Sequence, residues 1–523
     1  MARNTVYERV ARRRVQRSKF DLSHTRKWSG KFGKLYPSFL MEVLPNEIMN
    51  LRAESFTRFA PLISPAYHMI DQKTWFFYVP KRLLWKEFET WYTGGDDGLQ
   101  APIKPTWTIT EATRGEFAKG KLHDYLGVPV TDGHVTIPDP GIKIDKLQSR
   151  AYKLIWNEYF RDQDLQEPLD IEDETNNTSA ENFDILNANW NKDYFSSARP
   201  SAQKGPEIGL PMDIAYNPQY SDTSFVIDPN TGTNPIDGNI SNVGGEVNAD
   251  GTGPARIENL EREQEIEGSF LIEELRRASA VQRFTELLQR GGSRFKEVLY
   301  NFWGSKSSDG RLDRPEYLGG MSAPVSISEI QQTSATYDES QPIQATPQGN
   351  LAGHGISVNN QGIFSRRFEE PGFVMGLTTT RPAPGYHQGL HKMWQRFERF
   401  DEVWPQFANV GEQEVLNGEL YLDYGNPGIN DNPFGYQHRY SEMKHACNSV
   451  HGDFRDTLEH WHLDRKFSET PTLSADFIEV KEQGQNLRRI FATTDDTDYL
   501  WIQQYFHVKS RRPLPYFPIP TLR

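Results

Sequence analysis

Residues 73–85 read KTWFFYVPKRLLW, an unbroken run of aromatic and β-branched side chains that ends at a proline. Such a run, followed directly by a polar turn, predicts a β-strand and then a turn. Further runs of the same kind are separated by long segments rich in Gly, Pro and Asn, which favours an antiparallel sandwich or jelly roll over a fold with alternating strands and helices. These runs are HVTIP (134–138), GFVMGLTTT (372–380), GELYLDY (418–424), ADFIEV (475–480) and DYLWIQQYFHVKS (498–510).

The middle of the chain carries a different pattern. In residues 269–290, SFLIEELRRASAVQRFTELLQR, apolar side chains recur every three or four positions, which predicts an amphipathic helix. Residues 293–304 carry a second, shorter stripe after a Gly-Gly break. Residues 216–255, just before the first helix, are rich in Asn, Asp, Gly, Ser and Thr and hold few large apolar residues. Such a segment cannot build a core of its own, so we expect an exposed insertion.

Charge is segregated along the chain. The formal net charge is -13, yet residues 1–34 contain 11 Lys/Arg against two acids. The rest of the chain therefore carries 47 Lys/Arg against 69 Asp/Glu. This distribution predicts two different neighbours, one of them anionic.

Composition excludes several classes of protein. No apolar run approaches the ~18 residues of a membrane helix, and the basic N-terminus has no apolar signal core. An amphipathic transit peptide is the alternative interpretation of so Arg-rich a start. The single cysteine, Cys447, forbids an intrachain disulfide, and we expect it to be a small buried apolar residue.

Catalytic motifs are missing from the sequence. It has no phosphate-binding loop, dinucleotide fingerprint, nucleophile elbow or HExxH zinc motif. The pair His387 and His391 could share a helix face, but no third metal ligand accompanies it. Residues 228–239 loosely resemble a calcium loop but lack its central Gly and its final Glu. We therefore expect no enzyme activity, no cofactor and no metal.

Several stretches, in order along the chain, resemble the major capsid protein of Microviridae, small icosahedral bacteriophages with single-stranded DNA. They are RSKFDLSH (17–24), MEVLPNE (41–47), RFAPLISPAYHMIDQKTWFFYVPKRLLW (58–85), RFTELLQRGGSRFKEVL (283–299), GRLDRPEYLGG (310–320) and YFHVKSRRPLPYFPIP (505–520). The sequence departs from the family at Asn46-Glu47, where Gly-Asp is usual, so we expect that turn to differ.

The resemblance implies a mainly β fold, an eight-stranded antiparallel jelly roll with long insertions and a few helices, assembled as a T=1 shell around single-stranded DNA. The insertion corresponds in position to the surface protrusion of the gokushovirus-like branch. The implied partners are further copies of the chain, the DNA genome and a host surface receptor that contacts the insertion; a small basic DNA-packaging protein stays open as another. The chain would be assembled in the host bacterial cytoplasm, become part of the virion and not insert into a membrane. A non-viral β-rich protein that binds nucleic acid or carbohydrate is the alternative.

These observations predict a division of the chain into five parts. Residues 1–34 form a basic arm on the inside of the shell, and residues 35–190 the first part of the jelly roll. Residues 191–268 form the exposed insertion, residues 269–304 a helical pair, and residues 305–523 the rest of the jelly roll with a basic and aromatic C-terminal segment.

Two groups of residues are candidate functional sites. The flexible arm and the C-terminal segment offer guanidinium and ammonium groups to phosphates, with aromatic side chains nearby that can stack on bases. The alternative is that the arm pairs with the acidic surface of a neighbouring subunit. The nucleic-acid candidates are Arg12, Arg13, Arg14, Arg17, Lys19, Lys509, Arg511 and Arg512. Trp394 and Phe397, in the aromatic stretch 391–407, are candidates for a subunit interface, and packing in a core helix is the alternative for them.

Overall fold

The computed structural model describes residues 16–94, 99–130, 136–171, 183–205, 309, 313–333, 349–482, 484–493 and 497–517. It also describes helix α4 (Ile272–Gly291), with side chains at 276–287, 289 and 290, and the backbone of six short strands between residues 215 and 267. The chain divides into two compact units: Met1–Ala202 with Gln289–Arg523, and Gln203–Leu288. The second unit thus starts after the expected boundary at 191, because Tyr194, Phe195 and Ala198 are buried in a core cluster of the first unit.

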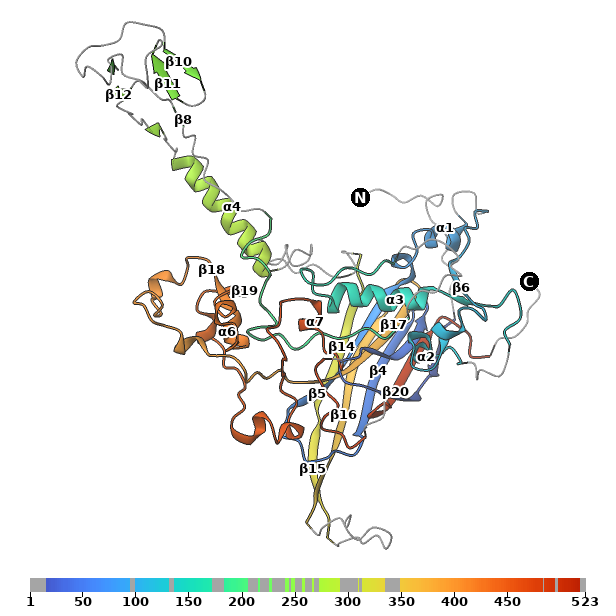
Figure 1. Cartoon of the computed structure of the whole chain (residues 1–523). Coiled ribbons are helices and arrows are strands. Elements are labelled where there is room, and N and C mark those ends of the chain that lie inside the picture. The colour runs from blue at the N-terminus through green and yellow to red at the C-terminus, as the bar shows by residue number, and fades with distance from the viewer. Residues whose placement is uncertain are drawn as a thin grey trace. The chain divides into compact units, whose positions relative to one another are not determined.

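Two antiparallel sheets form the centre of the first unit (Figure 1). Sheet I has the order β1-β20-β4-β16-β15, with β2 also paired to β20; sheet II has the order β14-β5-β17-β3. Without the short edge strands β1 and β15, eight strands remain, and they can be numbered 1 to 8 in chain order: β2, β3, β4, β5, β14, β16, β17 and β20. Sheet I then has the order 1-8-3-6 and sheet II the order 2-7-4-5, which is consistent with a jelly roll. The strands of sheet I are β1 (Ser18–Asp21), β2 (His24–Gly30), β4 (Ile48–Phe59), β15 (Ser326–Gln331), β16 (Leu351–Arg367) and β20 (Leu500–Arg512), and those of sheet II are β3 (Tyr36–Val43), β5 (Ile70–Pro80), β14 (Glu316–Pro324) and β17 (Gly372–Pro382).

Sheet II is buried on both faces. One face shares a core with sheet I, where Phe39, Phe76 and Val374 meet Leu51 and Phe506. Its other face packs against helix α3 (Leu147–Ile155) and the segments around it, including Trp107 and Phe183. Ten of the eleven residues of β17 are buried, which explains why this strand reads as an apolar run without alternation.

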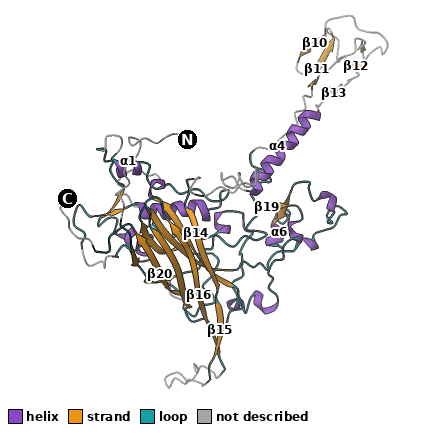
Figure 2. Cartoon of the chain, turned by 180° about the vertical axis from the view of Figure 1, so that it is seen from behind, coloured by secondary structure: helices purple, strands orange, loops and turns teal. Residues whose placement is uncertain are grey.

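In the part of the chain that the structure describes, sheet I is covered on one face only. Buried and exposed residues alternate along β4 and β20, because successive side chains of a strand point to opposite faces. The inward residues join the shared core, and the outward ones contact solvent. Figure 2 shows β16 and β20 from the side opposite to Figure 1.

Short helices and two small strand pairs complete the first unit. The strand pairs are β6 (Thr106–Ile109) with β7 (Ile142–Asp145), and β18 (Glu412–Leu416) with β19 (Pro433–His438). The helices are α1 (Phe88–Thr93), α2 (Leu122–Leu126), α3 (Leu147–Ile155), α6 (Asn417–Leu420) and α7 (Ala475–Ile478), with a π-helical turn at Trp156–Phe160 after α3.

The strand predictions succeed for the long runs and fail for two short ones. Residues 73–80, 372–380 and 500–510 lie in β5, β17 and β20 as predicted. The runs at 418–424 and 475–480 instead contain the one-turn helices α6 and α7, because a short apolar run does not distinguish a strand from a buried helical turn. Residues 136–138 form no strand, and the rest of that run lies outside the described residues.

The basic arm predicted for residues 1–34 is partly sheet. β1 and β2 both pair with β20, in registers that include Lys19 opposite Arg511 and Lys27 opposite Gln503. The expectation of a flexible segment is therefore wrong for residues 18–30. Residues 1–15 lie outside the described part of the chain.

The second unit holds three nested antiparallel strand pairs and most of α4. The pairs are β8 (Ala215–Tyr216) with β13 (Ile266–Glu267), β9 (Phe225–Ile227) with β12 (Arg256–Glu258), and β10 (Ile240–Val243) with β11 (Glu246–Ala249). Each pair encloses the next in sequence, so this excursion of the chain folds back on itself in the manner of a long hairpin. The predicted helix 269–290 corresponds to α4, whereas the second predicted helix, 293–304, lies outside the described residues.

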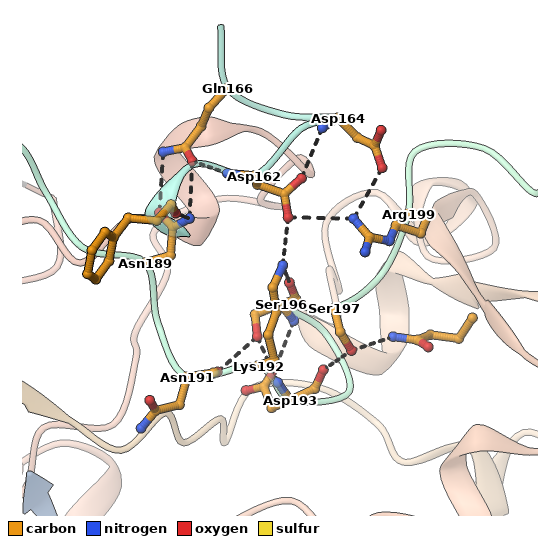
Figure 3. A network of polar contacts seen from close by, with 12 residues as sticks. Asp162, Asp164, Gln166, Asn189, Asn191, Lys192, Asp193, Ser196, Ser197 and Arg199 are labelled. Atoms are coloured by element: carbon orange, nitrogen blue, oxygen red, sulfur yellow. Dashed lines mark hydrogen bonds and ion pairs between the residues drawn. The ribbon is translucent and has the colours of Figure 1, made fainter. Parts of the chain in front are cut away.

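In the first unit, a polar network fixes residues 192–199, which lie shortly before its break at Ala202 (Figure 3). The buried carboxylate of Asp162 lies 2.7 Å from Lys192 Nζ and 3.6 Å from Arg199 Nη1, and Arg199 also contacts Asp164 at 3.1 Å. These ion pairs connect the loop after α3 to residues 192–199, shortly before the second unit starts.

Candidate nucleic-acid interface

The uncovered face of sheet I is rich in positive charge. Strand alternation and register place seven cations and two carboxylates on it, a net charge of +5 among the described residues. We call this surface the cationic face. Its cations are Lys19, Lys27, Arg52, Arg58, Arg367, Lys509 and Arg511, and its carboxylates are Asp21 and Glu54.

Most of these cations have no acidic partner among the described residues. Glu54 accepts a hydrogen bond from Asn360 at 3.1 Å, lies 3.0 Å from His507 Nε2, and is 4.0 Å from Arg52. Asp21 accepts hydrogen bonds from Ser23, which lower the pKa of its carboxyl group. The other cations of the face form no ion pair with a carboxylate that the structure describes. Their charge is therefore available to an external anion.

Exposed aromatic side chains lie on the same face as these cations. Trp501 and Phe56 keep 49% and 42% of their surface exposed although both lie in the middle of a sheet. Trp501 is directly opposite Arg58 across the β20–β4 pair, and the rings of Tyr505 and His507 meet edge to face at 4.3 Å. Exposed rings beside unpaired cations are the combination that stacks on bases and contacts phosphates.

The structure brings some of the sequence candidates together and separates others. Lys19, Lys509 and Arg511 lie on adjacent strands of the cationic face, and Arg17 directly precedes β1. Arg12, Arg13 and Arg14 lie outside the described residues. Of the aromatic residues around the C-terminal cluster, Tyr505 is on the cationic face and Tyr516 and Phe517 are exposed, whereas Phe506 is fully buried in the core between the sheets.

Arg512 has a different role from its neighbour Arg511. Its side chain projects to the opposite face of β20, where Nε donates to Glu47 Oε1 at 2.9 Å and Nη2 donates to the carbonyl of Glu42 at 3.0 Å. Glu47 is fully buried and also accepts hydrogen bonds from the Ser510 hydroxyl and the Leu44 amide. Arg512 therefore fastens the end of β20 to the turn before β4 and is not part of the cationic face.

That turn contains Asn46-Glu47, where the resemblance leads us to expect Gly-Asp. Asn46 has a φ of 67°, in the left-handed region that glycine adopts without cost and that asparagine tolerates better than most residues. Its amide donates to the carbonyl of Phe368 at 2.6 Å. The carboxylate that follows is Glu47, which reaches the end of β20.

Sequence reasoning missed Lys27, Arg52, Arg58, Arg367, Phe56 and Trp501. A signal was present for the β4 residues, because IMNLRAESFTRF (48–59) alternates between core and polar positions. The alternation did not show that β4 lies between β16 and β20 in the sheet.

A second exposed surface is the aromatic stretch 391–407, which we call the aromatic loop. Trp394 and Phe397 expose 65% and 86% of their surface, and only the 3-10 turns Lys392–Trp394 and Pro405–Phe407 interrupt the loop. Packing in a core helix, the alternative for these two residues, is therefore wrong. The loop is held by its own contacts, since Asp401 accepts from the amides of Phe397 and Glu398, and Arg396 pairs with the buried Glu442 at 3.1 Å.

The remaining candidates do not assemble into a chemical site. Cys447 is exposed, so its expected burial is wrong. His387 is buried and His391 is exposed, and no helix joins them. The described residues contain no group of three or more His, Cys, Asp or Glu placed to hold a metal, and the calcium-like stretch 228–239 lies outside them. No described helix has the length and apolar character that crossing a bilayer demands.

A β-sandwich with one uncovered cationic and aromatic sheet face defines a class: jelly-roll proteins that use broad surfaces for assembly and binding, as virus shell subunits do. Comparison with known proteins identifies the family. The model of the phage family described as "Capsid protein (F protein)" matches residues 9–522, and the chain belongs to this family. It is therefore a bacteriophage capsid protein and part of the virion.

The relatives found by comparison are similar over almost their whole length. The chain is 31% identical to "Capsid protein VP1" of Chlamydia phage 1, over 97% of this chain and 96% of the relative. It is 32% identical to "Capsid protein VP1" of Bdellovibrio phage phiMH2K, over 97% and 95%. It is 28% identical to "Capsid protein VP1" of Spiroplasma virus 4, over 97% and 96%. The resemblance to Microviridae capsid proteins is thereby confirmed.

Proposed function

We propose that copies of this chain assemble into a small icosahedral T=1 shell around single-stranded DNA, with the cationic face of sheet I turned toward the DNA. The observation that carries this orientation is the net charge of +5 on an uncovered sheet face in a chain whose net charge is -13. A closed shell has one surface next to a polyanion and one next to solvent. Segregated charge matches these two surfaces.

The chemistry of the cationic face fits an irregular single strand. Lys and Arg contact phosphates without reading sequence, and Trp501, Phe56 and Tyr505 offer flat surfaces to unpaired bases. The three arginines at 12–14 precede β1 closely in the sequence, and β1 lies beside Arg511. We propose that they extend the same interface.

The aromatic loop is the proposed contact between subunits. Closed shells use heterologous contacts, whose anchors are commonly Trp, Phe and Arg. Trp394 and Phe397 are exposed on a loop that its own hydrogen bonds already order, so little conformational entropy is lost on association. The insertion, with residues 216–255, is proposed to lie on the outer surface and to contact the host receptor. A small basic packaging protein would be a further ligand of the cationic face.

Removal of residues 2–19 tests the orientation of the shell. The truncated chain should bind single-stranded DNA more weakly and with a shallower salt dependence, because Arg12, Arg13, Arg14, Arg17 and Lys19 are lost. Particle formation without DNA is measured in parallel by sedimentation. Unchanged DNA affinity combined with lost assembly would show that the arm joins subunits instead.

Replacement of both Trp394 and Phe397 by alanine tests the subunit contact. Particle yield should fall while the thermal unfolding of the isolated subunit stays the same, because both side chains are already exposed in the subunit. Equal loss of yield and stability would place these residues in the core and contradict the proposal.

A further inference from the structure

Three histidines and one aspartate come together where residues 454–464 pack against the rest of the first unit. His68 lies between β4 and β5, and His387 follows β17. His462 and Asp464 belong to the 454–464 segment itself. The rings of His387 and His462 meet edge to face with centroids 6.1 Å apart, and Asp464 Oδ2 is 3.2 Å from His462 Nδ1. His387 and His462 are buried, His68 is half-buried, and we call the four residues the histidine cluster.

The hydrogen bonds of His68 require an uncharged ring. Its Nδ1 accepts from the amide of Leu463 at 3.3 Å, and its Nε2 donates to the carbonyl of Ala383 at 2.9 Å. A backbone amide always carries its hydrogen, so the ring atom that faces it must have a free lone pair. Protonation of Nδ1 would set two donors against each other. The neutral ring therefore joins the 454–464 segment to the residues that follow β17.

His462 is held in the same protonation state. Its Nδ1 accepts from the amide of Asp464 at 3.1 Å, and its Nε2 donates to the carbonyl of Phe454 at 2.7 Å. The Asp464 carboxylate near the same Nδ1 is a partner for the charged ring only. A proton on Nδ1 would therefore break the amide contact and form an ion pair in its place. In its neutral form His462 connects the two ends of the segment.

The charges around the cluster do not favour further protons. Burial lowers the pKa of His68 and of His387 below the usual value. Burial alone would raise the pKa of Asp464, but its contact with His462 and the nearby histidines outweigh burial and lower it, so the carboxylate stays ionised. It is fixed in place, because a β-carbon at Gly385 would overlap Asp464 Oδ1, and it can pair with one imidazole at a time. The other charged groups that face the histidines among the described residues are Arg455, Lys466 and Arg489, and Glu459, near Arg489, is already paired with Lys466.

We propose that the histidine cluster is an acid-sensitive lock: protonation of His68 and His462 releases the 454–464 segment from the sandwich, while sheets I and II stay paired. Because the pKa values of His68 and His387 lie below that of a free histidine, the stabilisation that these residues contribute is complete above about pH 6.5 and is lost as pH falls through the lowered values. Release would alter the surface around the exposed Tyr67, whose ring lies 5.3 Å from that of Trp461 and whose amide donates to the Trp461 carbonyl. The lock is a property of the single subunit and does not depend on the proposed orientation of the shell.

Hydrogen exchange of the full chain, followed by mass spectrometry at pH 7.5 and pH 5.0, tests the lock. After correction for the intrinsic effect of pH on exchange, the amides of the 454–464 segment should lose protection by at least about tenfold. The upper limit is about 30-fold for each histidine that stays neutral in the closed form, because a free histidine with a pKa of about 6.5 is mostly protonated at pH 5.0. Amides in β17 and β20 should keep their protection. His123, whose pKa burial lowers to about 4, should remain neutral over this range.

Asparagine variants separate protonation from the mere presence of a polar side chain. In His68→Asn/His462→Asn the amide oxygen can accept from the same backbone N–H group and cannot titrate, so the acid-induced loss of protection should disappear. His68→Asn alone should show a smaller loss than the unmodified chain, and it serves as the test if the double variant does not fold. The matched control, His445→Asn/His451→Asn, removes two exposed histidines close to the segment and should respond to acid as the unmodified chain does.

The remaining outcomes would contradict the lock. Equal protection of the segment at both pH values in the unmodified chain overturns it. An acid response of the double variant that equals the response of the control overturns it as well. Simultaneous loss of protection in the segment, β17 and β20 would show that acid unfolds the sandwich as a whole, with no separate release of the segment.

Discussion

Neutralising Lys509 and Arg511 by glutamine is the most informative perturbation of the cationic face. Both side chains are exposed on β20, point away from the core and form no ion pair with a described carboxylate, so their loss should leave the sandwich intact. The net charge of +5 suggests about five phosphate contacts. Each contact with a single strand contributes about -0.7 to the slope of log K against log salt concentration, so the face contributes about -3.5 and the double variant should have a slope shallower by about 1.4 than the unmodified protein.

The assay is fluorescence anisotropy of a labelled oligonucleotide between 50 and 200 mM salt. From this difference, the fall in affinity over that range should be about sevenfold smaller for the variant than for the unmodified protein. A matched control replaces the exposed Lys119 and Lys444 by glutamine, which removes the same charge elsewhere on the surface. Its slope should equal that of the unmodified protein.

The same assay should distinguish the contribution of base stacking to DNA affinity from the contribution of charge. Trp501→Ala should weaken binding by about 1–3 kcal/mol at every salt concentration, because it removes a ring and no charge, and should leave the slope unchanged. Equal slopes for the Lys509/Arg511 variant and the unmodified protein would refute the assignment of DNA to this face, as would an equal drop in the Lys119/Lys444 control.

Three further predictions concern the stability of the subunit and the surface of the particle. Glu47→Ala should lower the free energy of unfolding by about 1–3 kcal/mol in urea titrations, because it removes the buried carboxylate that accepts hydrogen bonds from Arg512, Ser510 and Leu44; a loss below about 1 kcal/mol would show that the contact is dispensable. Burial alone would raise the pKa of Asp162, but Lys192 and Arg199 outweigh it and the pKa is lowered, so its stabilisation is present above about pH 4 and is lost as pH falls through the lowered value. Asp162→Asn should therefore unfold at lower urea near pH 7 and show a smaller acid-induced loss of stability than the unmodified protein; parallel pH profiles would contradict this. Limited proteolysis of intact particles should cut first within residues 216–255, and protection there with cleavage elsewhere would contradict their outer position.

The sequence by itself determined the class of fold and the family. The runs at 73–80, 372–380 and 500–510 are rich in the aromatic and β-branched residues that favour strands, and the family motifs lie in order along the chain. It also showed that the N-terminus and the C-terminal segment are basic. It could not resolve the short runs at 418–424 and 475–480, because a few apolar residues are buried equally well by one helical turn.

Only the tertiary structure decided which cations share a surface. Arg511 and Arg512 are neighbours in sequence, yet the two-residue period of a strand sends one to the cationic face and the other to Glu47, 465 residues away in the chain. The cationic face itself joins β1, β2, β4, β16 and β20, which come from both ends and the middle of the sequence. The local sequence pattern shows which residues of one strand share a face. Which strands lie side by side, and so which residues share a surface, depends on the packing of the whole core.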